Sequence, residues 1–322
     1  MIENFKPQTR AEAYWGAISG DYEGEIPKPQ TTTECYLAAM SGNYDGELPT
    51  PHTRMHMLMR NATLEMAKKS ELLLKEVIIQ DGVTAIEPMA FRGRLNITSV
   101  KIPDSVTTIG ANAFYWCPAL GSITIPDSVT TIGSYAFKDC ASLTSITIPD
   151  SVTALGEGAF CSCTALKSVI MPNSVTSIGT DTFSNCTSLT SITIPDSVTT
   201  IGDRGKFATY GAFSGCTALT SITIPNSVTA IYGASFKNCT SLSSITIPDS
   251  VTALGTADNR NHTGMFAGCR SLKSITIPNS VIAIGDRAFS LSGVETITIN
   301  KPENSISGAP WGATNATVVW TG

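Results

Sequence analysis

Most of this chain repeats one segment of 23 residues. The stretch ITIPDSVTTIG occurs at 123–133 and again, letter for letter, at 192–202, and near copies extend the series in both directions. When the copies are aligned on the last apolar residue of each strand-like segment, successive positions are 23 residues apart, except for two intervals of 30 and one of 22. The aligned positions are Ile79, Ile102, Ile125, Ile148, Met171, Ile194, Ile224, Ile247, Ile277 and Ile299. Self-similarity with a period of about 20–50 residues is typical of solenoids, so we expect about ten stacked repeats.

Within a repeat, the order of residue types predicts a strand, a turn and a return to the core. In the copy at 143–163, Ile146 and Ile148 alternate with Ser145 and Thr147. Alternation with period two places the isoleucines inside and the hydroxyls outside. The Pro-Asp-Ser segment that follows predicts a turn, because proline presets φ and short polar side chains bond back to the backbone. The residues expected to re-enter the core and form a corner are Val152, Leu155 and Gly156.

A phenylalanine and a cysteine, three residues apart, close each repeat. Residues at this spacing share one face of a helical turn, so a short helical turn is expected around Phe160 and Cys163. Seven of the nine cysteines occupy this position. The other pairs are Phe114 and Cys117, Phe137 and Cys140, Phe183 and Cys186, Phe213 and Cys216, Phe236 and Cys239, and Phe266 and Cys269.

We expect these cysteines to be buried, reduced thiols that pack as small hydrophobic residues. Stacked repeats lie about 4.7–4.9 Å apart with parallel Cβ vectors, and a disulfide favours a Cβ separation of about 3.8 Å. A redox or metal-binding role is the alternative. It is less favoured, because tetrahedral zinc needs ligands that converge on one point and a linear column of thiols does not converge.

The pattern L-x-S-I-T-I-P-x-S-V-T-x-I-G-x-x-A-F-x-x-C, over about residues 76–300, resembles the BspA-like class of bacterial leucine-rich repeats. The resemblance implies an α/β repeat solenoid, a right-handed coil of about ten 23-residue repeats, with short N-terminal helices and a C-terminal cap. Members of that class are commonly surface-associated proteins that bind host or environmental ligands. The resemblance therefore implies binding rather than catalysis.

Four parts are expected along the chain. They are an N-terminal helical repeat or attachment segment at 1–60, a capping helix at 61–76, the solenoid at 77–300 and a C-terminal cap at 301–322. The caps are expected because the open ends of a solenoid need covering. The residues expected to plug the last repeat are Trp311, Val318, Val319 and Trp320.

A second, shorter repeat of 22 residues precedes the solenoid. TRAEAYWGAISGDYEGEIPKPQ at 9–30 aligns with TTTECYLAAMSGNYDGELPTPH at 31–52. Thr9 and Glu12 have the spacing of a capping box, as does the matching pair of the second copy, so each copy is expected to open a short helix. Helices this short are marginal alone in water and need a partner.

These N-terminal units resemble short repeats near the start of phage and prophage structural proteins of Gram-positive bacteria. The resemblance implies that residues 1–60 form an attachment or assembly segment, either through homo-oligomerisation or by docking onto a virion. The alternative is a helical cap peculiar to this chain. The start, MIENFKPQTR, lacks the apolar core of a secretory signal, which departs from the export usual in the BspA-like class.

The two repeats that are seven residues longer supply the candidate binding residues. Both gain their length between the Ile/Leu-Gly corner and the phenylalanine, and insertions at one place project from one side of a solenoid. These inserts carry hydrogen-bonding and aromatic side chains that the other repeats lack. The candidates are Asp203, Arg204, Lys206, Tyr210, Asp258, Asn259, Arg260 and His262. The alternative is neutral loop variation, since long surface loops cost little free energy.

Two further columns were considered as sites. Ser145 and Thr147 belong to two rows of outward hydroxyls, which are expected to be solvated β-surface, with a polysaccharide platform or an ice-binding face as alternatives. Asp150 belongs to a row of Asp and Asn residues after each proline. Carboxylates could attract Ca²⁺, but the first role of these residues is to close turns.

Charge and motifs exclude several classes of function. The net charge of −5 and a pI near 5.3, without a strong basic run, argue against nucleic acid as a partner. No segment approaches the ~18 consecutive apolar residues of a membrane span, so no membrane insertion is expected. Only His52, His56 and His262 could act as imidazole bases, and no phosphate-binding loop, nucleophile elbow or His-Glu-x-x-His motif occurs. We therefore expect neither an enzyme nor a cofactor.

The sequence thus predicts a non-enzymatic protein that binds a protein or a surface glycan. A phage or prophage component that contacts the bacterial surface is the first interpretation, with a location in a virion or at the cell surface. The alternatives are a bacterial cell-surface adhesin and a structural spacer.

Overall fold

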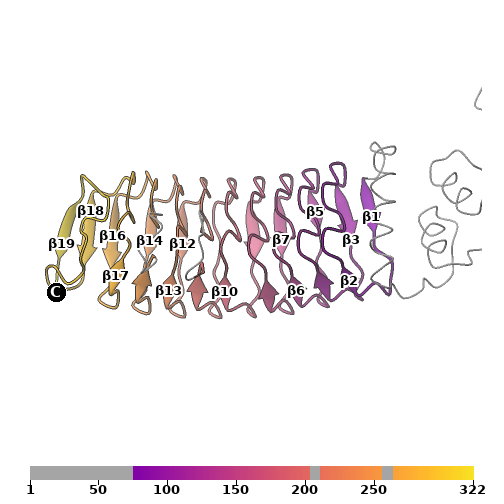
Figure 1. The fold of residues 1–322 in the computed structure, drawn as a ribbon, viewed down its shortest axis with the longest axis horizontal. Helices are drawn as coiled ribbons and strands as arrows, with labels where there is room; N and C mark the ends of the chain where they lie inside the picture. The colour runs from indigo at the N-terminus through magenta and orange to yellow at the C-terminus, as the bar shows by residue number, and fades with distance from the viewer. Residues whose placement is uncertain (1–74, 204–210, 256–263) are drawn as a thin grey trace, which may run out of the picture. The chain divides into compact units, whose positions relative to one another are not determined.

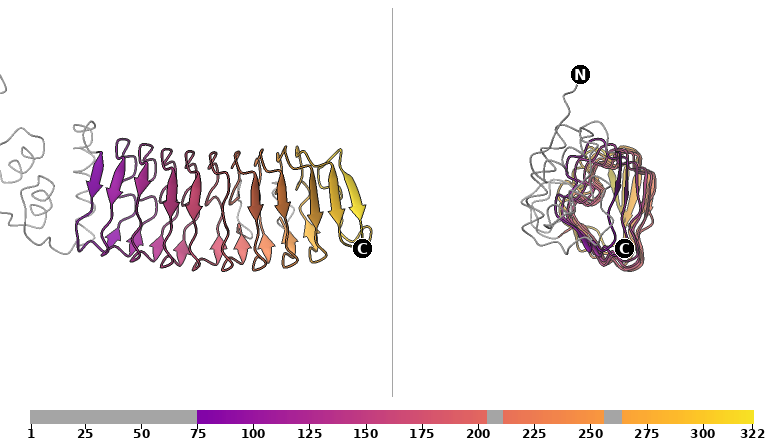
Figure 2. Two further views of the ribbon diagram at one scale, coloured as in Figure 1. Left: turned by 180° about the vertical axis from the view of Figure 1, so that it is seen from behind. Right: turned by 90° about the vertical axis from the view of Figure 1, so that its right-hand side faces the viewer.

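The part of the chain that the structure describes is a stack of similar coils (Figure 1). The computed structural model describes residues 75–203, 211–255 and 264–322. The coils follow one another along a common axis in sequence order, and they superimpose when viewed along it (Figure 2). The prediction of a solenoid built from the repeats is confirmed.

One side of the stack, which we call the long-strand wall, consists of parallel strands. They pair in sequence order with equivalent residues opposite each other, for example Ser145 with Ser168 and Ile146 with Val169. Equivalent positions of all repeats therefore form columns. The strands are β1 (Glu76–Ile78), β3 (Ser99–Lys101), β5 (Ser122–Ile123), β7 (Ser145–Thr147), β9 (Ser168–Ile170), β12 (Ser221–Thr223), β14 (Ser244–Thr246), β16 (Ser274–Ile277), β18 (Thr296–Ile299) and β19 (Thr317–Trp320). The repeat between β9 and β12 contributes a single bridge, from Thr193 to Thr223.

A second side, the short-strand wall, follows the Pro-Asp-Ser turn of each repeat. Its two-residue strands also pair in parallel, and their apolar residues return to the core as expected. They are β2 (Ala85–Ile86), β4 (Thr108–Ile109), β6 (Thr131–Ile132), β8 (Ala154–Leu155), β10 (Ser177–Ile178), β11 (Thr200–Ile201), β13 (Ala230–Ile231), β15 (Ala253–Leu254) and β17 (Ala283–Ile284).

The third side, the turn wall, corrects the predicted α/β class. The segment around each Phe-x-x-Cys pair is a series of β-turns, and residues 75–203, 211–255 and 264–322 contain no helix. The amide of Phe137 donates to the carbonyl of Ala159 in the next repeat, at 2.8 Å, instead of to a carbonyl one helical turn back. The second residue after each phenylalanine has positive φ, such as 61° at Asp139, which a continuing α-helix does not allow. The described chain is thus an all-β solenoid.

The core consists of columns of identical side chains. Phenylalanine rings stack from Phe91 to Phe289, with centroids 5.1–5.7 Å apart and planes within 9° of parallel. Phe160 and Cys163 are fully buried, although no helical turn presents them. Burial of each phenylalanine contributes about 1.5–3 kcal/mol. Because each ring is covered by the rings of both neighbours, stability in the stack is shared between repeats.

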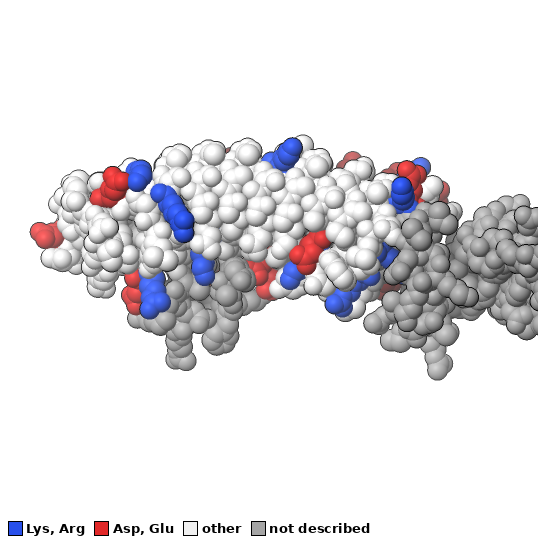
Figure 3. Space-filling view, turned by 90° about the horizontal axis from the view of Figure 1, so that it is seen from above, with Lys and Arg blue, Asp and Glu red and all other residues white. Residues whose placement is uncertain are grey.

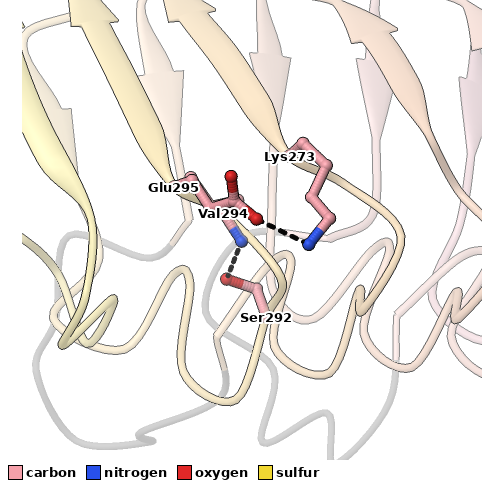
Figure 4. A network of polar contacts seen from close by, with 4 residues as sticks. All are labelled: Lys273, Ser292, Val294 and Glu295. Carbon is pink, nitrogen blue, oxygen red and sulfur yellow. Dashed lines mark hydrogen bonds and ion pairs between the residues drawn. The ribbon is translucent and has the colours of Figure 1, made fainter.

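The C-terminal segment extends the stack. Strand β19 pairs in parallel with β18, and Trp311 is fully buried while its indole nitrogen donates to the carbonyl of Ser307 at 2.8 Å. One exposed ion pair bridges neighbouring repeats here, from Lys273 to Glu295 at 2.7 Å (Figure 4). Exposed pairs of this kind contribute about 0–1 kcal/mol, so the core and not this pair stabilises the end.

The N-terminal predictions fall largely outside the described residues. Residues 1–60 and most of the helix expected at 61–76 are among them, while Glu76 already belongs to strand β1. Within the described ranges, no helical segment has the length and apolarity needed to cross a bilayer.

Candidate functional site

Of the candidate residues in the two inserts, the structure describes only Asp203. Its Oδ2 atom accepts a hydrogen bond from the backbone amide of Thr180, 23 positions earlier, at 3.1 Å. Asp203 therefore ties its own repeat to the one before it. The other candidates lie outside the described residues: Arg204, Lys206, Tyr210, Asp258, Asn259, Arg260 and His262.

The cysteine column is part of the core, as expected. All eight described cysteines are buried and free of disulfides. The Sγ atom of Cys140 donates to the carbonyl of Phe114 in the preceding repeat at 3.2 Å, and each cysteine of the column repeats this contact. Burial raises the pKa of Cys117 to about 11 and that of Cys269 to about 12. At neutral pH these thiols are protonated, and thiols in that form are poor nucleophiles and metal ligands.

The long-strand wall presents the predicted hydroxyl surface. Ser145 and Thr147 are exposed, and the residues between them and after them point inward. The regularity of the two columns is broken by Ile170, which is 63% exposed in the threonine column. Charged side chains are also sparse on the face of the solenoid that is seen from above (Figure 3). The Ser/Thr columns are thus exposed, and the pattern offers no single place that differs from its surroundings enough to mark a site.

The Asp and Asn column closes turns. Oδ1 of Asp150 accepts a hydrogen bond from the amide of Asn173 in the next repeat at 2.7 Å. Among the described residues, no three His, Cys, Asp or Glu side chains converge as metal ligands would. The zinc hypothesis for His52 and His56 concerns residues outside the described ranges.

The feature that breaks the monotony of the repeats is an open depression on the turn wall, toward its corner with the long-strand wall. We call it the aromatic groove. It has a volume of about 630 Å³ and runs across four consecutive repeats. The residues that line it are Arg92, Tyr115, Trp116, Pro118, Asp139, Ala141, Ser162 and Thr164.

The turn wall positions the aromatic residues of the groove. Tyr115 and Trp116 are the first and second residues after the buried Phe114, so their side chains point outward. Trp116 has φ of 59° and is 55% exposed. Its amide donates to the carbonyl of Lys138 at 2.8 Å, which holds the backbone against the next repeat. A Cβ atom added to Gly93 would lie 3.8 Å from Cε3 of Trp116, so the indole lies beside the backbone of the preceding repeat.

Cations order the tyrosines beside the groove. The guanidinium carbon of Arg92 lies 5.0 Å from the centroid of Tyr115, and Nζ of Lys138 lies 5.6 Å from the same ring. Nζ of Lys138 is also 5.3 Å from the ring of Tyr135. Contacts of this type contribute about 0.5–1 kcal/mol at exposed sites. Tyr115 is therefore held between two cations, while the indole of Trp116 remains the exposed aromatic surface.

Acidic residues lie next to this cluster. The hydroxyl of Tyr135 donates to Oε1 of Glu157 at 3.1 Å. Burial, together with Glu157, raises the pKa of Tyr135 to about 12. Burial and then Glu157 also raise the pKa of Asp181 to about 6, against the opposing effect of Lys138. The Oδ1 atom of Asp181 is buried without a hydrogen-bond partner. Of the residues that line the groove itself, only Arg92 and Asp139 are charged, and their charges are opposite.

Gly158 makes room for Tyr135. A Cβ atom at Gly158 would overlap Cε1 and Cδ1 of the tyrosine ring, so only glycine lets the ring lie over this repeat. Gly158 also has φ of 60°, which a larger side chain adopts less readily.

The sequence analysis missed the aromatic groove. A signal was present, because the two positions between Phe and Cys carry Tyr-Trp only at 115–116, and hydroxyl, small or charged residues elsewhere. The analysis favoured residues added by insertion over residues substituted within the repeat. It could not see that Arg92 and Asp139, each 23 residues from its counterpart beside Trp116, meet at one place.

Comparison with known proteins agrees with the fold. The family model of the BspA type leucine rich repeat region, in six copies, matches residues 84–208 and 188–310. It does not reach residues 1–60, and no comparison supports their resemblance to phage proteins. No curated protein matches the chain.

Several solved structures are similar. A leucine-rich repeat protein from Eubacterium ventriosum ATCC 27560 is 26% identical with a TM-score of 0.50, over 76% of this chain and 66% of that one. The leucine-rich repeat protein of T. pallidum is 29% identical with a TM-score of 0.45, over 62% and 78%. A leucine rich cell surface protein from Faecalibacterium prausnitzii A2-165 is 28% identical with a TM-score of 0.33, over 77% and 88%. Because the family model matches more than half of its length, the chain belongs to the BspA-type leucine-rich repeat family.

Proposed function

We propose that this chain is a non-catalytic adhesion protein that binds its ligand through the aromatic groove. The observation that carries the proposal is the gathering of Arg92, Tyr115 and Trp116 in one depression of an otherwise uniform surface. Trp, Tyr and Arg are the residue types that most often dominate binding energy at interfaces. Most other outward positions of the repeats carry Ser, Thr, Ala or Gly.

The rigidity of the turn wall supports this role. Phe114 is fully buried two residues before Trp116, which is 55% exposed. The backbone that carries the indole is hydrogen-bonded to the next repeat, so little conformational entropy is lost when a ligand covers it. A large aromatic side chain on a rigid support gives contact area at a low entropic cost.

The proposal can be tested with a substitution that the repeat itself offers. Asn185 and Asn238 occupy the position of Trp116 in later repeats, with φ of 58° and 60°. The variant Trp116→Asn should therefore fold like the parent chain. We expect labelled full-length protein to bind fixed epithelial cells or Gram-positive bacterial cells, and Trp116→Asn to lower that binding at least tenfold with an unchanged melting temperature.

Leu291→Ala is the matched control. Leu291 occupies the same position eight repeats after Gly93 and is 86% exposed, but it lies outside the groove. This variant should bind like the parent chain. Equal binding by the parent chain, Trp116→Asn and Leu291→Ala, or no binding to either type of cell, would contradict the proposal.

The insert residues are a second proposed contact surface. Replacing Arg204, Tyr210, Arg260 and His262 together with alanine should weaken binding in the same cell assay without unfolding the protein. If the quadruple variant binds as tightly as the parent chain, the inserts have no part in ligand recognition.

Residues 1–60 are proposed to mediate homo-oligomerisation or docking, which would place several grooves side by side. Light scattering on the full chain and on a version without residues 1–60 tests this, and the full chain should have the larger mass. Two monomers of the expected masses, with no partner particle bound, would oppose it. The phage or prophage component and the structural spacer, which the sequence left as alternatives, have no observation of comparable weight in their favour.

A further inference from the structure

The aromatic groove has the dimensions of an extended chain of a few small units. Its lining comes from four consecutive repeats, so it spans three repeat intervals along the solenoid axis, about 15 Å at the spacing of parallel strands. The units of an extended hexose chain are about as long as one repeat is high. Successive sugar rings could therefore face successive repeats.

The polar side chains of the groove follow this period. Asp139 and Ser162 occupy the position of Trp116 in the next two repeats. Ala141 and Thr164 stand in the same way two residues further along, in line with Pro118. An aromatic surface is thus followed, one repeat at a time, by a carboxylate and then by hydroxyls. Binding pockets for small molecules combine such an apolar platform with a few placed polar groups.

We infer that the aromatic groove binds a neutral hexose oligosaccharide, with one ring stacked on Trp116 and the next hydrogen-bonded to Asp139 and Arg92. This inference rests on the proposed function and names its ligand class. The apolar face of a hexose ring packs against an aromatic ring. The hexose hydroxyls both donate to a carboxylate and accept from a guanidinium, and hydrogen bonds to such charged groups are the stronger ones.

The charges of the groove favour a neutral ligand. Arg92 and Asp139 are the only charged lining residues, and they balance each other. Glu157 and Asp181 add negative charge nearby, while Lys138 lies over the tyrosines. A uronate, a sialylated glycan or an acidic peptide finds no net positive field, and the complementarity of potentials governs such encounters.

The backbone of the groove argues against an extended peptide. Peptides that add to a sheet pair with free backbone groups of an edge. Here the amides of Trp116, Asp139 and Ser162 all donate to carbonyls of the next repeat, at 2.7–2.8 Å. The groove therefore offers side chains and no free row of amides, which suits a ligand that is recognised through ring faces and hydroxyls.

The test is calorimetric titration of the full chain with four neutral tetrasaccharides: cellotetraose, mannotetraose, maltotetraose and chitotetraose. We expect at least one to bind, and Trp116→Asn to weaken its affinity tenfold or more. Tyr115→Ser, a change to the residue found at the same position in Ser184 and Ser214, should weaken it less, because Tyr115 is covered by Arg92 and Lys138. Leu291→Ala should leave the affinity unchanged.

The outcomes separate this inference from the proposed function. If none of the four tetrasaccharides binds the parent chain, or if Trp116→Asn binds them equally well, the glycan inference is wrong. Should cell binding nevertheless depend on Trp116, the proposed function stands and the ligand is a protein. If neither cells nor tetrasaccharides depend on Trp116, both proposals fail.

Discussion

Position within the repeat decides what each residue can do. Trp116 and Asn238 occupy the same backbone position with φ of 59° and 60°, yet one is an exposed aromatic residue and the other a small amide. The hydrogen bonds that set this backbone come from neighbouring repeats and not from the side chain. The outward side chain is therefore free to vary, and binding chemistry can be placed on this wall without disturbing the core.

Asp181 carries a testable effect of pH on stability. Its carboxyl is partly buried beside Glu157, and burial raises its pKa to about 6. A carboxyl with a raised folded-state pKa favours folding in its protonated form, so its contribution is greatest below the unfolded-state pKa of about 4 and is lost as the pH rises through about 6.

We therefore expect Asp181→Asn to stabilise the protein above pH 6, by no more than about 1 kcal/mol because the carboxyl is partly solvated. Asn112 already occupies this position in an earlier repeat, with φ of 56°. Urea unfolding at pH 4.5 and pH 7.5 measures the effect, which should nearly disappear at the lower pH. Asp196→Asn, a change at an exposed turn, is the control. An equal gain at both pH values would contradict the assignment.

At the scale of the element, the turn wall is held by its neighbours rather than by itself. Within one repeat it has only short-range turns, while Phe137 donates to Ala159 and Cys140 donates to Phe114, each in another repeat. A helix of the few residues available would be marginal in water. Bonds to two neighbours satisfy the same backbone groups at the repeat spacing that the parallel strands require. The helical expectation failed for this reason.

The phenylalanine column gives the prediction at this scale. Phe183 is fully buried between Phe160 and Phe213, with ring centroids 5.7 Å away on both sides. Phe183→Ala should lower the free energy of unfolding by about 3–5 kcal/mol, since it opens a cavity against two repeats. Phe91→Ala is the matched comparison, because Phe91 is only partly buried and stacks on Phe114 alone among the described phenylalanines. It should cost clearly less in the same denaturant titration, and equal losses would argue against sharing along the column.

At the scale of the whole solenoid, the repeat is the unit that can be removed. Parallel strands pair equivalent residues throughout, for example Ile109 with Ile132 and Ile132 with Leu155. Each repeat of a solenoid contacts only its neighbours. A chain that loses one full period keeps every column in register, and a chain that loses a fraction of one does not.

Deleting residues 166–188, which make up one period after the aromatic groove, should give a folded protein with a circular dichroism spectrum like that of the parent chain. Deleting residues 166–176 should abolish cooperative unfolding, because every later apolar column is moved off the core. Both outcomes are read from thermal melts. Similar melts for the two deletions would contradict a stack held by columns in register.

The amino-acid sequence alone determined the period, the inward isoleucines, the buried phenylalanine and cysteine columns and the exposed hydroxyls, because each follows from spacing within one repeat. Only the tertiary structure decided that the third wall is made of turns, since its backbone hydrogen bonds join residues in different repeats. The aromatic groove is of the same kind. Arg92, Trp116 and Asp139 are separated by most of a repeat in sequence and become neighbours only when the coils stack.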